Sequence, residues 1–319
     1  MCNSSTPSPY QLPADAQTAP VGDQDPDVSG VRPKQSSSGS KRKLEYPPAP
    51  APLPVAVIDN HTHFNFRDGL VEVSAREAMD VAESVGVKAV VQVGCDLESS
   101  RFTVEAVNAD ARLLGAVAIH PNDAPQYAAR GELESALAEI EEMAQHPRIR
   151  AIGETGLDFF RTDGDEDLAQ QRYSFRRHID IAKRLGLALQ IHDRDAHSEV
   201  VKVLKEEGAP EKVIFHCFSA DAELAKICNE NGWFMSFAGT VTFKNAAGIR
   251  EGLAVAEREL IMVETDSPFL TPHPYRGQPN ASYMIPYTVR GMAELTGIEL
   301  SELGQLLCDN TEKAYGSWE

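Results

Sequence analysis

The sequence predicts an α/β protein: a single (β/α)8 TIM barrel that follows a disordered N-terminal tail. Two observations support this prediction. Eight short, nearly continuous apolar runs alternate with amphipathic helical patterns after residue 54, which indicates parallel strands covered by helices on their outer face. The length of the remaining chain, residues 55–319, also matches the ~250 residues that such a barrel typically needs. We therefore expect a tail over residues 1–54 and one barrel domain over residues 55–319.

The tail is expected from composition. Ser, Pro, Ala, Gln and Asp dominate residues 1–54, and no aliphatic periodicity appears there. Such a segment buries too little apolar surface to offset the entropy lost on ordering. It has no apolar core typical of a secretory signal, and no apolar run in the chain approaches the roughly 18 residues of a membrane span. We expect a cytoplasmic monomer with no membrane partner.

The strands are expected wherever short β-branched runs recur. They are Val55–Asn60, Lys88–Val93, Leu113–Ile119, Arg150–Glu154, Leu187–His192, Lys212–His216, Trp233–Phe237 and Leu260–Glu264. Helices are expected between cap residues and a following Gly or Pro, where apolar residues recur with helical spacing. They are Ala75–Val85, Glu132–Gln145, Asp167–Leu185, Ala196–Glu207, Ala222–Asn231, Ala246–Glu257, Tyr283–Leu295 and Ser301–Tyr315.

A doubly wound open sheet is the alternative architecture. It would normally bind a nucleotide through a Gly-rich turn after the first strand. The first turn here carries His61-Thr62-His63 instead, so the barrel is preferred.

Charge and cysteine usage narrow the class of function. A net charge of −18 argues against broad adhesion to nucleic acid or to anionic membranes. It does not exclude a nucleic-acid enzyme, because bound cations can make a local site attractive to phosphates. The five cysteines lack short paired spacing, which favours a reducing compartment over a disulfide framework.

Side chains that bind metals end five of the expected strands. The two histidines of the first motif point to the same side of an extended backbone, because side chains alternate along a strand. In a barrel the carboxyl ends of all strands converge on one face. Histidines and carboxylates are the donors that a pair of divalent ions requires. The strand ends that carry such donors are His61-Thr62-His63, Gly153-Glu154-Thr155-Gly156-Leu157-Asp158, Ile191-His192-Asp193, Phe215-His216 and Glu264-Thr265-Asp266, which predicts a metal site built from several histidines and two carboxylates.

The strand-end motifs resemble those of the TatD family of metal-dependent deoxyribonucleases, within the amidohydrolase superfamily. The resemblance covers essentially the whole chain after the tail and implies a metal-dependent phosphodiesterase, in several members a 3′–5′ exonuclease on DNA. The motifs are His61-Thr62-His63, Ile119-His120-Pro121, Gly153-Glu154-Thr155-Gly156-Leu157-Asp158, Ile191-His192-Asp193-Arg194, Phe215-His216-Cys217-Phe218-Ser219 and Glu264-Thr265-Asp266-Ser267-Pro268.

The resemblance also implies how the ligands are shared. One ion would be held by Glu154 and Asp266 together with the histidines of the first motif, His61 and His63. Glu154 would bridge to a second ion, which the ligands from strands five and six complete, namely His192 and His216. Asp266 would take the proton of the attacking water, a role that suits a carboxylate beside a metal. The implied cofactors are two divalent ions, drawn from Mg, Mn, Zn and Fe.

Substrate contacts are expected at the barrel mouth, with DNA or another phosphodiester as the partner. His120 and Arg276 match family positions near the phosphate, and an arginine can hold a phosphate through two hydrogen bonds. Arg194 is a further candidate, with pairing to Asp193 or Asp195 as the alternative.

Other residues have smaller expected roles. Asp158 would orient a ligand or cap a loop. The remaining histidines are expected at the surface or in caps, and three aromatic side chains are candidates for stacking on bases. The histidines are His146, His178, His197 and His273, and the aromatic residues are Phe159, Phe160 and Tyr275.

The chain departs from the family pattern only in its loops. Phe64-Asn65 stand where Leu-Asp is common, Ser219-Ala220 replace a common Ser-Gly, and Ala281-Ser282 follow Asn280 where Glu-Pro is usual. None of these changes removes an expected ligand.

Two rival interpretations remain. An amidohydrolase could act on a small-molecule amide, lactone or ester, but many two-metal members bridge their ions with a carboxylated lysine where this chain has Glu154. A barrel retained only as a scaffold would show a broken ligand set, whereas all six ligand positions are filled here.

Overall fold

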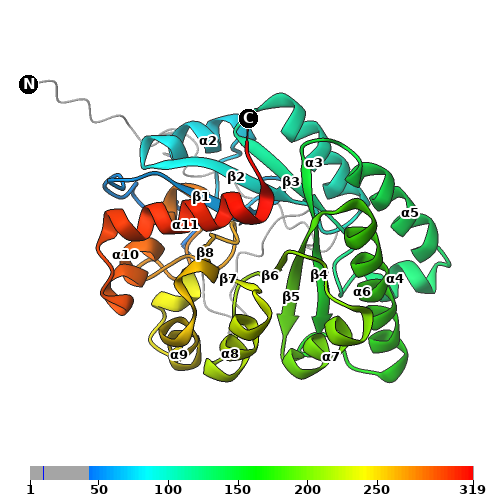
Figure 1. The fold of residues 1–319 in the computed structure, drawn as a ribbon. Coiled ribbons are helices and arrows are strands. Elements are labelled where there is room, and N and C mark those ends of the chain that lie inside the picture. Colours follow the sequence, from blue (N-terminus) through cyan, green and yellow to red (C-terminus); the bar gives the residue numbers. More distant parts are fainter. Residues whose placement is uncertain (1–9, 11–42, 319) are drawn as a thin grey trace, which may run out of the picture.

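The computed structural model describes Tyr10 and residues 43–318, so most of the expected tail, with Cys2, lies outside the described residues. Within the described part of the chain, eight strands form one parallel sheet in the order β1 to β8 (Figure 1). The predicted (β/α)8 barrel is confirmed. The strands are β1 (Val57–Thr62), β2 (Val87–Val93), β3 (Leu113–Val117), β4 (Ile149–Asp158), β5 (Ala188–Arg194), β6 (Val213–Phe215), β7 (Phe234–Phe237) and β8 (Ile261–Val263).

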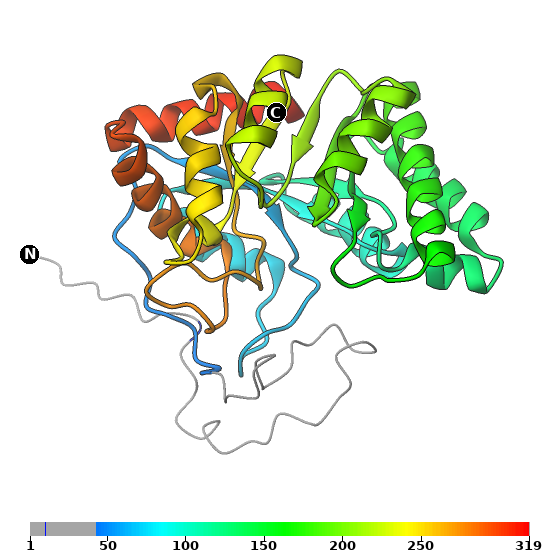
Figure 2. The same ribbon diagram turned by 90° about the horizontal axis from the view of Figure 1, so that it is seen from below.

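Helices surround the strands on the outside of the barrel, as Figures 1 and 2 show. The α-helices are α2 (Ala75–Ser84), α3 (Leu97–Ala109), α4 (Ala124–Ala129), α5 (Leu133–Ala144), α6 (Asp165–Leu185), α7 (His197–Glu207), α8 (Ala222–Asn231), α9 (Ala247–Val255), α10 (Ile285–Thr296) and α11 (Leu300–Tyr315). Short 3-10 helices are η2 (Gly239–Thr242), η3 (Arg258–Leu260) and η4 (Ser282–Met284). Among the described residues, no helix is both long and apolar enough to cross a membrane.

The barrel closes between β1 and the chain that follows β8. The backbone N–H of Asp266 donates to the carbonyl of His61 at 2.9 Å, and the N–H of His63 donates to the carbonyl of Ser267 at 2.8 Å. Deeper in the barrel, Nδ2 of Asn60 donates to the carbonyl of Val263 at 2.6 Å. The closing bonds therefore place Asp266 beside both histidines of the first motif.

Helix α3 was not predicted from the sequence. Its residues Leu97–Ala109 are rich in Ser, Thr and Val, which are weaker helix formers than Ala or Leu. The signal that could have found it is its N-cap. The Asp96 side chain accepts a hydrogen bond from the N–H of Ser99 at 2.7 Å, and Asp is among the preferred N-cap residues.

The chain before β1 is packed although it contains no helix or strand over residues 43–54. The Tyr283 hydroxyl donates to the carbonyl of Pro47 at 2.6 Å, and the N–H of Leu53 donates to the carbonyl of Val85 at 3.0 Å. Figure 2 shows this blue segment beside the orange segment that follows β8. The packed chain therefore starts before residue 55, the boundary expected from composition.

Candidate metal centre

Glu154 lies on β4 between two glycines that let this strand lie close to β5. A Cβ atom on Gly153 would come within 2.4 Å of the Gln190 Cβ, and one on Gly156 within 2.0 Å of the His192 carbonyl. Gly156 also has a φ of +140°, which residues with a Cβ rarely adopt. The Gly-Glu-Thr-Gly sequence therefore brings the Glu154 side chain and His192 together.

One oxygen of Glu154 faces the histidines that end β3, β5 and β6. Its Oε1 lies 2.7 Å from Nδ1 of His192, 2.9 Å from Nε2 of His216 and 3.4 Å from Nε2 of His120. His120 was expected to contact substrate, and the structure places it in this donor group. His120, Glu154 and His192 form one set whose ligand atoms lie within 4.8 Å of one another.

The other oxygen of Glu154 faces the first motif. Its Oε2 lies 3.6 Å from Nε2 of His61 and 3.8 Å from Nε2 of His63. Oδ1 of Asp266 completes this group at 3.4 Å from Nε2 of His63 and 3.8 Å from Nε2 of His61. Glu154 thus presents one oxygen to each of two separate sets of donors.

Asp266 has a φ of +52°, a left-handed conformation that costs energy in residues other than glycine. The backbone bond from its N–H to the carbonyl of His61 helps to hold it there. This bond belongs to the closure of the barrel, so the fold itself holds the backbone of Asp266 beside the first motif.

The protonation states fit a cation. Burial alone would raise the pKa of Glu154, but the charges of His216 and His120 hold it well below its ordinary value. Burial likewise opposes ionisation of Asp266, yet the hydrogen bond from His63 keeps its pKa lowered. Burial disfavours the charged form of His216, while Glu154 and Glu264 raise its pKa well above the ordinary value. The carboxylates are therefore ionised, and positive charge is stabilised among them.

Two residues at the centre were not predicted. Glu264 is fully buried, and its Oε1 accepts hydrogen bonds from Nδ1 of His216 at 3.0 Å and from the N–H of Cys217 at 2.8 Å. The signal for it was a second carboxylate at the end of the eighth strand. Cys95, at the end of β2, places its Sγ 3.5 Å from Oε2 of Glu154. Burial raises the pKa of the Cys95 thiol well above its ordinary value, so it donates a weak hydrogen bond to the carboxylate.

His178 contradicts its expected surface or capping role. Its side chain is fully buried on α6. Nε2 accepts a hydrogen bond from the N–H of Ile119 at 3.2 Å, and Nδ1 lies 2.9 Å from Oγ1 of Thr155. These two contacts join the strand ends that carry His120 and Glu154. The three other histidines of that group, His146, His197 and His273, are exposed or half-buried.

The two expected arginines make aromatic contacts. The Arg194 guanidinium lies 4.1 Å from the ring centre of Phe160, a side chain that is 63% exposed. Asp193, its expected ion-pair partner, instead contacts Nδ1 of His197 at 2.7 Å.

Arg276 follows β8. Its guanidinium lies 4.3 Å from the ring centre of Phe243 and donates to Oδ1 of Asn245 at 3.3 Å. Both arginines thus come from segments at the carboxyl ends of the strands, as the expected substrate contacts require.

Histidines and carboxylates clustered at the carboxyl ends of a parallel barrel are typical of a metal-dependent hydrolase. Residues 58–316 match the family model described as TatD related DNase. The chain is 43% identical over 263 residues to an uncharacterized metal-dependent hydrolase, TatD, of Mycobacterium tuberculosis, covering 82% of this chain and 98% of that protein. It is 34% identical to the uncharacterized metal-dependent hydrolase YabD of Bacillus subtilis, covering 81% of this chain and 98% of that protein.

Solved structures agree on the fold. The crystal structure of YjjV, a TatD homologue of Escherichia coli, matches with a TM-score of 0.74 at 23% identity, covering 82% of this chain and 98% of that one. The hydrolase TatD family protein of Entamoeba histolytica matches with a TM-score of 0.71 at 18% identity, covering 83% of this chain and 100% of that one. The chain belongs to the TatD related DNase family.

Proposed function

We propose that this protein hydrolyses phosphodiester bonds in DNA at a centre of two divalent ions, releasing nucleotides from the 3′ end. The observation that carries the proposal is that the two carboxylate oxygens of Glu154 face different groups of histidines. Its Oε2 faces His61 and His63, while its Oε1 faces His192 and His216. A carboxylate placed this way is suited to bridge two ions, and paired ions suit in-line displacement at phosphorus.

The donor set supports divalent ions because three of the histidines already have partners for the nitrogen that faces away from Glu154. Metal-binding histidines almost always donate that second N–H to a carboxylate or carbonyl, which fixes the ring. The pairs are His63 Nδ1 with the carbonyl of Val93 at 2.9 Å, His192 Nε2 with Oδ2 of Asp158 at 3.2 Å, and His216 Nδ1 with Oε1 of Glu264 at 3.0 Å. Asp158 would thereby orient His192, one of the proposed ligands.

Divalent ions bound here would supply Lewis acidity toward the phosphate and lower the pKa of a bound water. Asp266 is the residue that accepts the proton of the attacking water. Its lowered pKa keeps the carboxylate ionised at neutral pH, and the backbone bond to His61 holds it beside the first motif. A carboxylate of this kind acts as a general base without leaving its position.

The mouth supplies the basic groups that an acidic protein needs to hold DNA. Arg194 lies two residues after His192, at the end of β5. Arg276 follows β8 and lies against Phe243. Both arginines would contact phosphates of the substrate, while the net charge of −18 discourages DNA contact elsewhere.

The test uses the full chain, chelated and then reloaded separately with Mg²⁺, Mn²⁺ or Zn²⁺. Single-stranded DNA labelled at its 3′ or its 5′ end, RNA, a small phosphodiester, and a panel of lactones and amides serve as substrates. We expect early release of the 3′ label and loss of turnover in Asp266→Asn. The matched control is Glu259→Gln, which removes an exposed carboxylate outside the centre. Turnover of lactones or amides by a protein inactive on every phosphodiester would overturn the proposal.

A further inference from the structure

His61 is an exception among the expected metal ligands. Its Nε2 faces Glu154 and Asp266, so its Nδ1 must carry the proton if Nε2 binds a metal. This Nδ1 is buried and has no hydrogen-bond partner among the described residues. Leaving a buried donor in this state costs free energy. The other three histidines of the centre avoid that cost through the partners described above.

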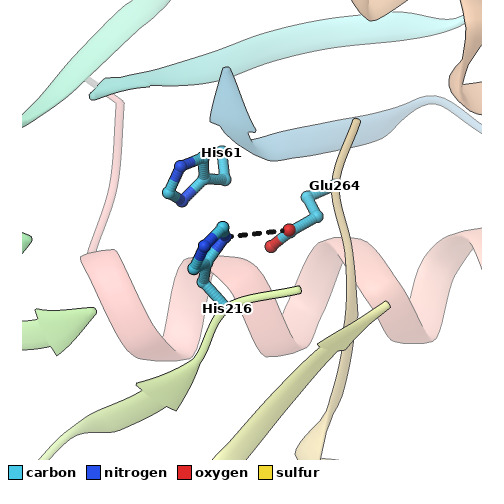
Figure 3. A group of neighbouring side chains, drawn as sticks. All are labelled: His61, His216 and Glu264. Carbon is cyan, nitrogen blue, oxygen red and sulfur yellow. Dashed lines mark hydrogen bonds and ion pairs between the residues drawn. The ribbon is translucent and has the colours of Figure 1, made fainter. Parts of the chain in front are cut away.

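A candidate acceptor lies in the same cluster of side chains, although no direct hydrogen bond joins it to His61 in the structure. Oε2 of Glu264 is also buried without a hydrogen-bond partner among the described residues, although Oε1 of the same carboxylate holds His216. One ligand atom each of His61, His216 and Glu264 lies within 4.8 Å of the others. Figure 3 shows the His61 ring above the His216 ring, with the carboxylate beside them. The two rings are stacked, with centres 3.8 Å apart and planes 17° apart.

An extra cation among these three residues is the less suitable interpretation. A neutral imidazole has one lone pair and one N–H. In His61 and His216 the Nε2 lone pair is directed at the Glu154 side of the centre. Each Nδ1 therefore carries a hydrogen, which repels a cation and needs an acceptor.

We propose that Glu264 is a positioning residue that joins the two halves of the metal centre: Oε1 accepts the Nδ1–H of His216, and Oε2 moves within reach of the Nδ1–H of His61 and accepts it when ions are bound. The inference rests on the two-ion function proposed above, because His61 and His216 face different oxygens of Glu154 and so belong to different proposed ions. Glu264 itself is held by the fold, since its backbone N–H donates to the carbonyl of Phe237 on β7 at 3.2 Å. One buried carboxylate would thus orient a ligand of each ion.

The direct test is NMR of the Zn²⁺-loaded full chain labelled with ¹⁵N-histidine. We expect the His61 Nδ1–H, once assigned, to be shifted downfield and protected from exchange, like that of His216. An unprotected His61 N–H, exchanging as fast as that of the exposed His273, would overturn the proposal. This measurement needs no substitution, so it remains decisive if a variant fails to fold.

The second test compares Glu264→Gln with Asp158→Asn as a matched control. Glutamine keeps one acceptor oxygen and places an NH2 group at the other, so only one of the two imidazoles keeps an acceptor. We expect Glu264→Gln to weaken Zn²⁺ binding at both ion sites, with a loss of ~10–100-fold. Asp158→Asn should weaken only the site that contains His192. Equal effects of the two variants, confined to one ion, would contradict the shared role.

Failure of this inference is distinguishable from failure of the proposed function. Neither readout involves DNA, so an inactive protein can still show a protected His61 N–H. A chain that binds only one Zn²⁺ would contradict the two-ion function and with it the joining role of Glu264, whereas a protected His61 N–H would still establish the hydrogen bond.

Discussion

Replacing His178 with glutamine should remove a specific part of the pH dependence of folding. In the folded protein, burial lowers the pKa of His178 from 6.5 to about 3. The imidazole accepts the N–H of Ile119 through Nε2. Protonation of Nε2 would remove this acceptor and place two N–H donors face to face. Below pH 6.5 the unfolded chain binds a proton that the folded chain refuses. The contribution of His178 to stability is therefore complete above its unfolded pKa and is lost as the pH falls toward 3.

The size of the effect follows from proton linkage. Each pH unit in that window costs 2.303RT per proton, or about 1.4 kcal/mol. Between pH 6.5 and about pH 4.5, where the unfolded histidine is almost fully charged and the folded one is still neutral, His178 alone should cost ~2 kcal/mol.

The assay is urea unfolding of wild type and His178→Gln across this range, with chelator present. The histidines of the metal centre titrate in both proteins, so their contribution cancels in the difference between the two curves. We expect the gap in free energy of unfolding between the two proteins to narrow by ~2 kcal/mol between pH 6.5 and about pH 4.5. Parallel curves would refute the neutral, buried assignment of His178.

Four further outcomes are expected. Glu154→Gln should leave at most one ion per chain by elemental analysis; two retained ions would contradict the bridge. Asp266→Asn should lower kcat on a small phosphodiester by ~10²–10⁴-fold, and an unchanged kcat would remove its role as base. Arg276→Ala should raise KM for an oligonucleotide about tenfold but not for the small phosphodiester; equal changes would contradict a clamp on distant phosphates. Removing residues 1–54 should destabilise the protein by ~2–4 kcal/mol more than removing residues 1–42, because several hydrogen bonds worth ~0.5–1.5 kcal/mol each are lost; matching denaturation curves would show that residues 43–54 add nothing.

Much of the barrel could be predicted because its strands are buried on both faces and therefore appear as continuous apolar runs. The prediction failed where something other than an apolar pattern determines the local structure. Strand β4 extends to Asp158, four residues beyond the predicted end, because the glycines around Glu154 let it remain paired with β5. Helix α3 was missed because Ser and Thr on its inner face obscure the apolar stripe. Residues 43–54 are held by contacts such as the hydrogen bonds of Pro47 and Leu53, which composition does not reveal.

The donors of the centre could be predicted because a parallel barrel brings all its strand ends to one face. The residues that support these donors could not be predicted. His178 reaches the centre from α6, where the sequence shows only a histidine in a helix. Glu264 was quoted as part of a motif, but its role depends on pointing into the barrel toward His216, which no spacing rule specifies.

The position of Asp266 shows why these supporting residues matter. The same backbone bonds that close the barrel between β1 and the chain after β8 also bring the Asp266 carboxylate to His61 and His63. Asp59, fully buried on β1, accepts from the N–H of Thr265 at 2.8 Å and from its Oγ1 at 2.6 Å, immediately before that carboxylate. Any change that loosens this closure would move two residues together: His61, a proposed metal ligand, and Asp266, the proposed general base. Substitutions at the contact between Asp59 and Thr265, where the barrel closes, should therefore impair metal binding and turnover before they unfold the barrel.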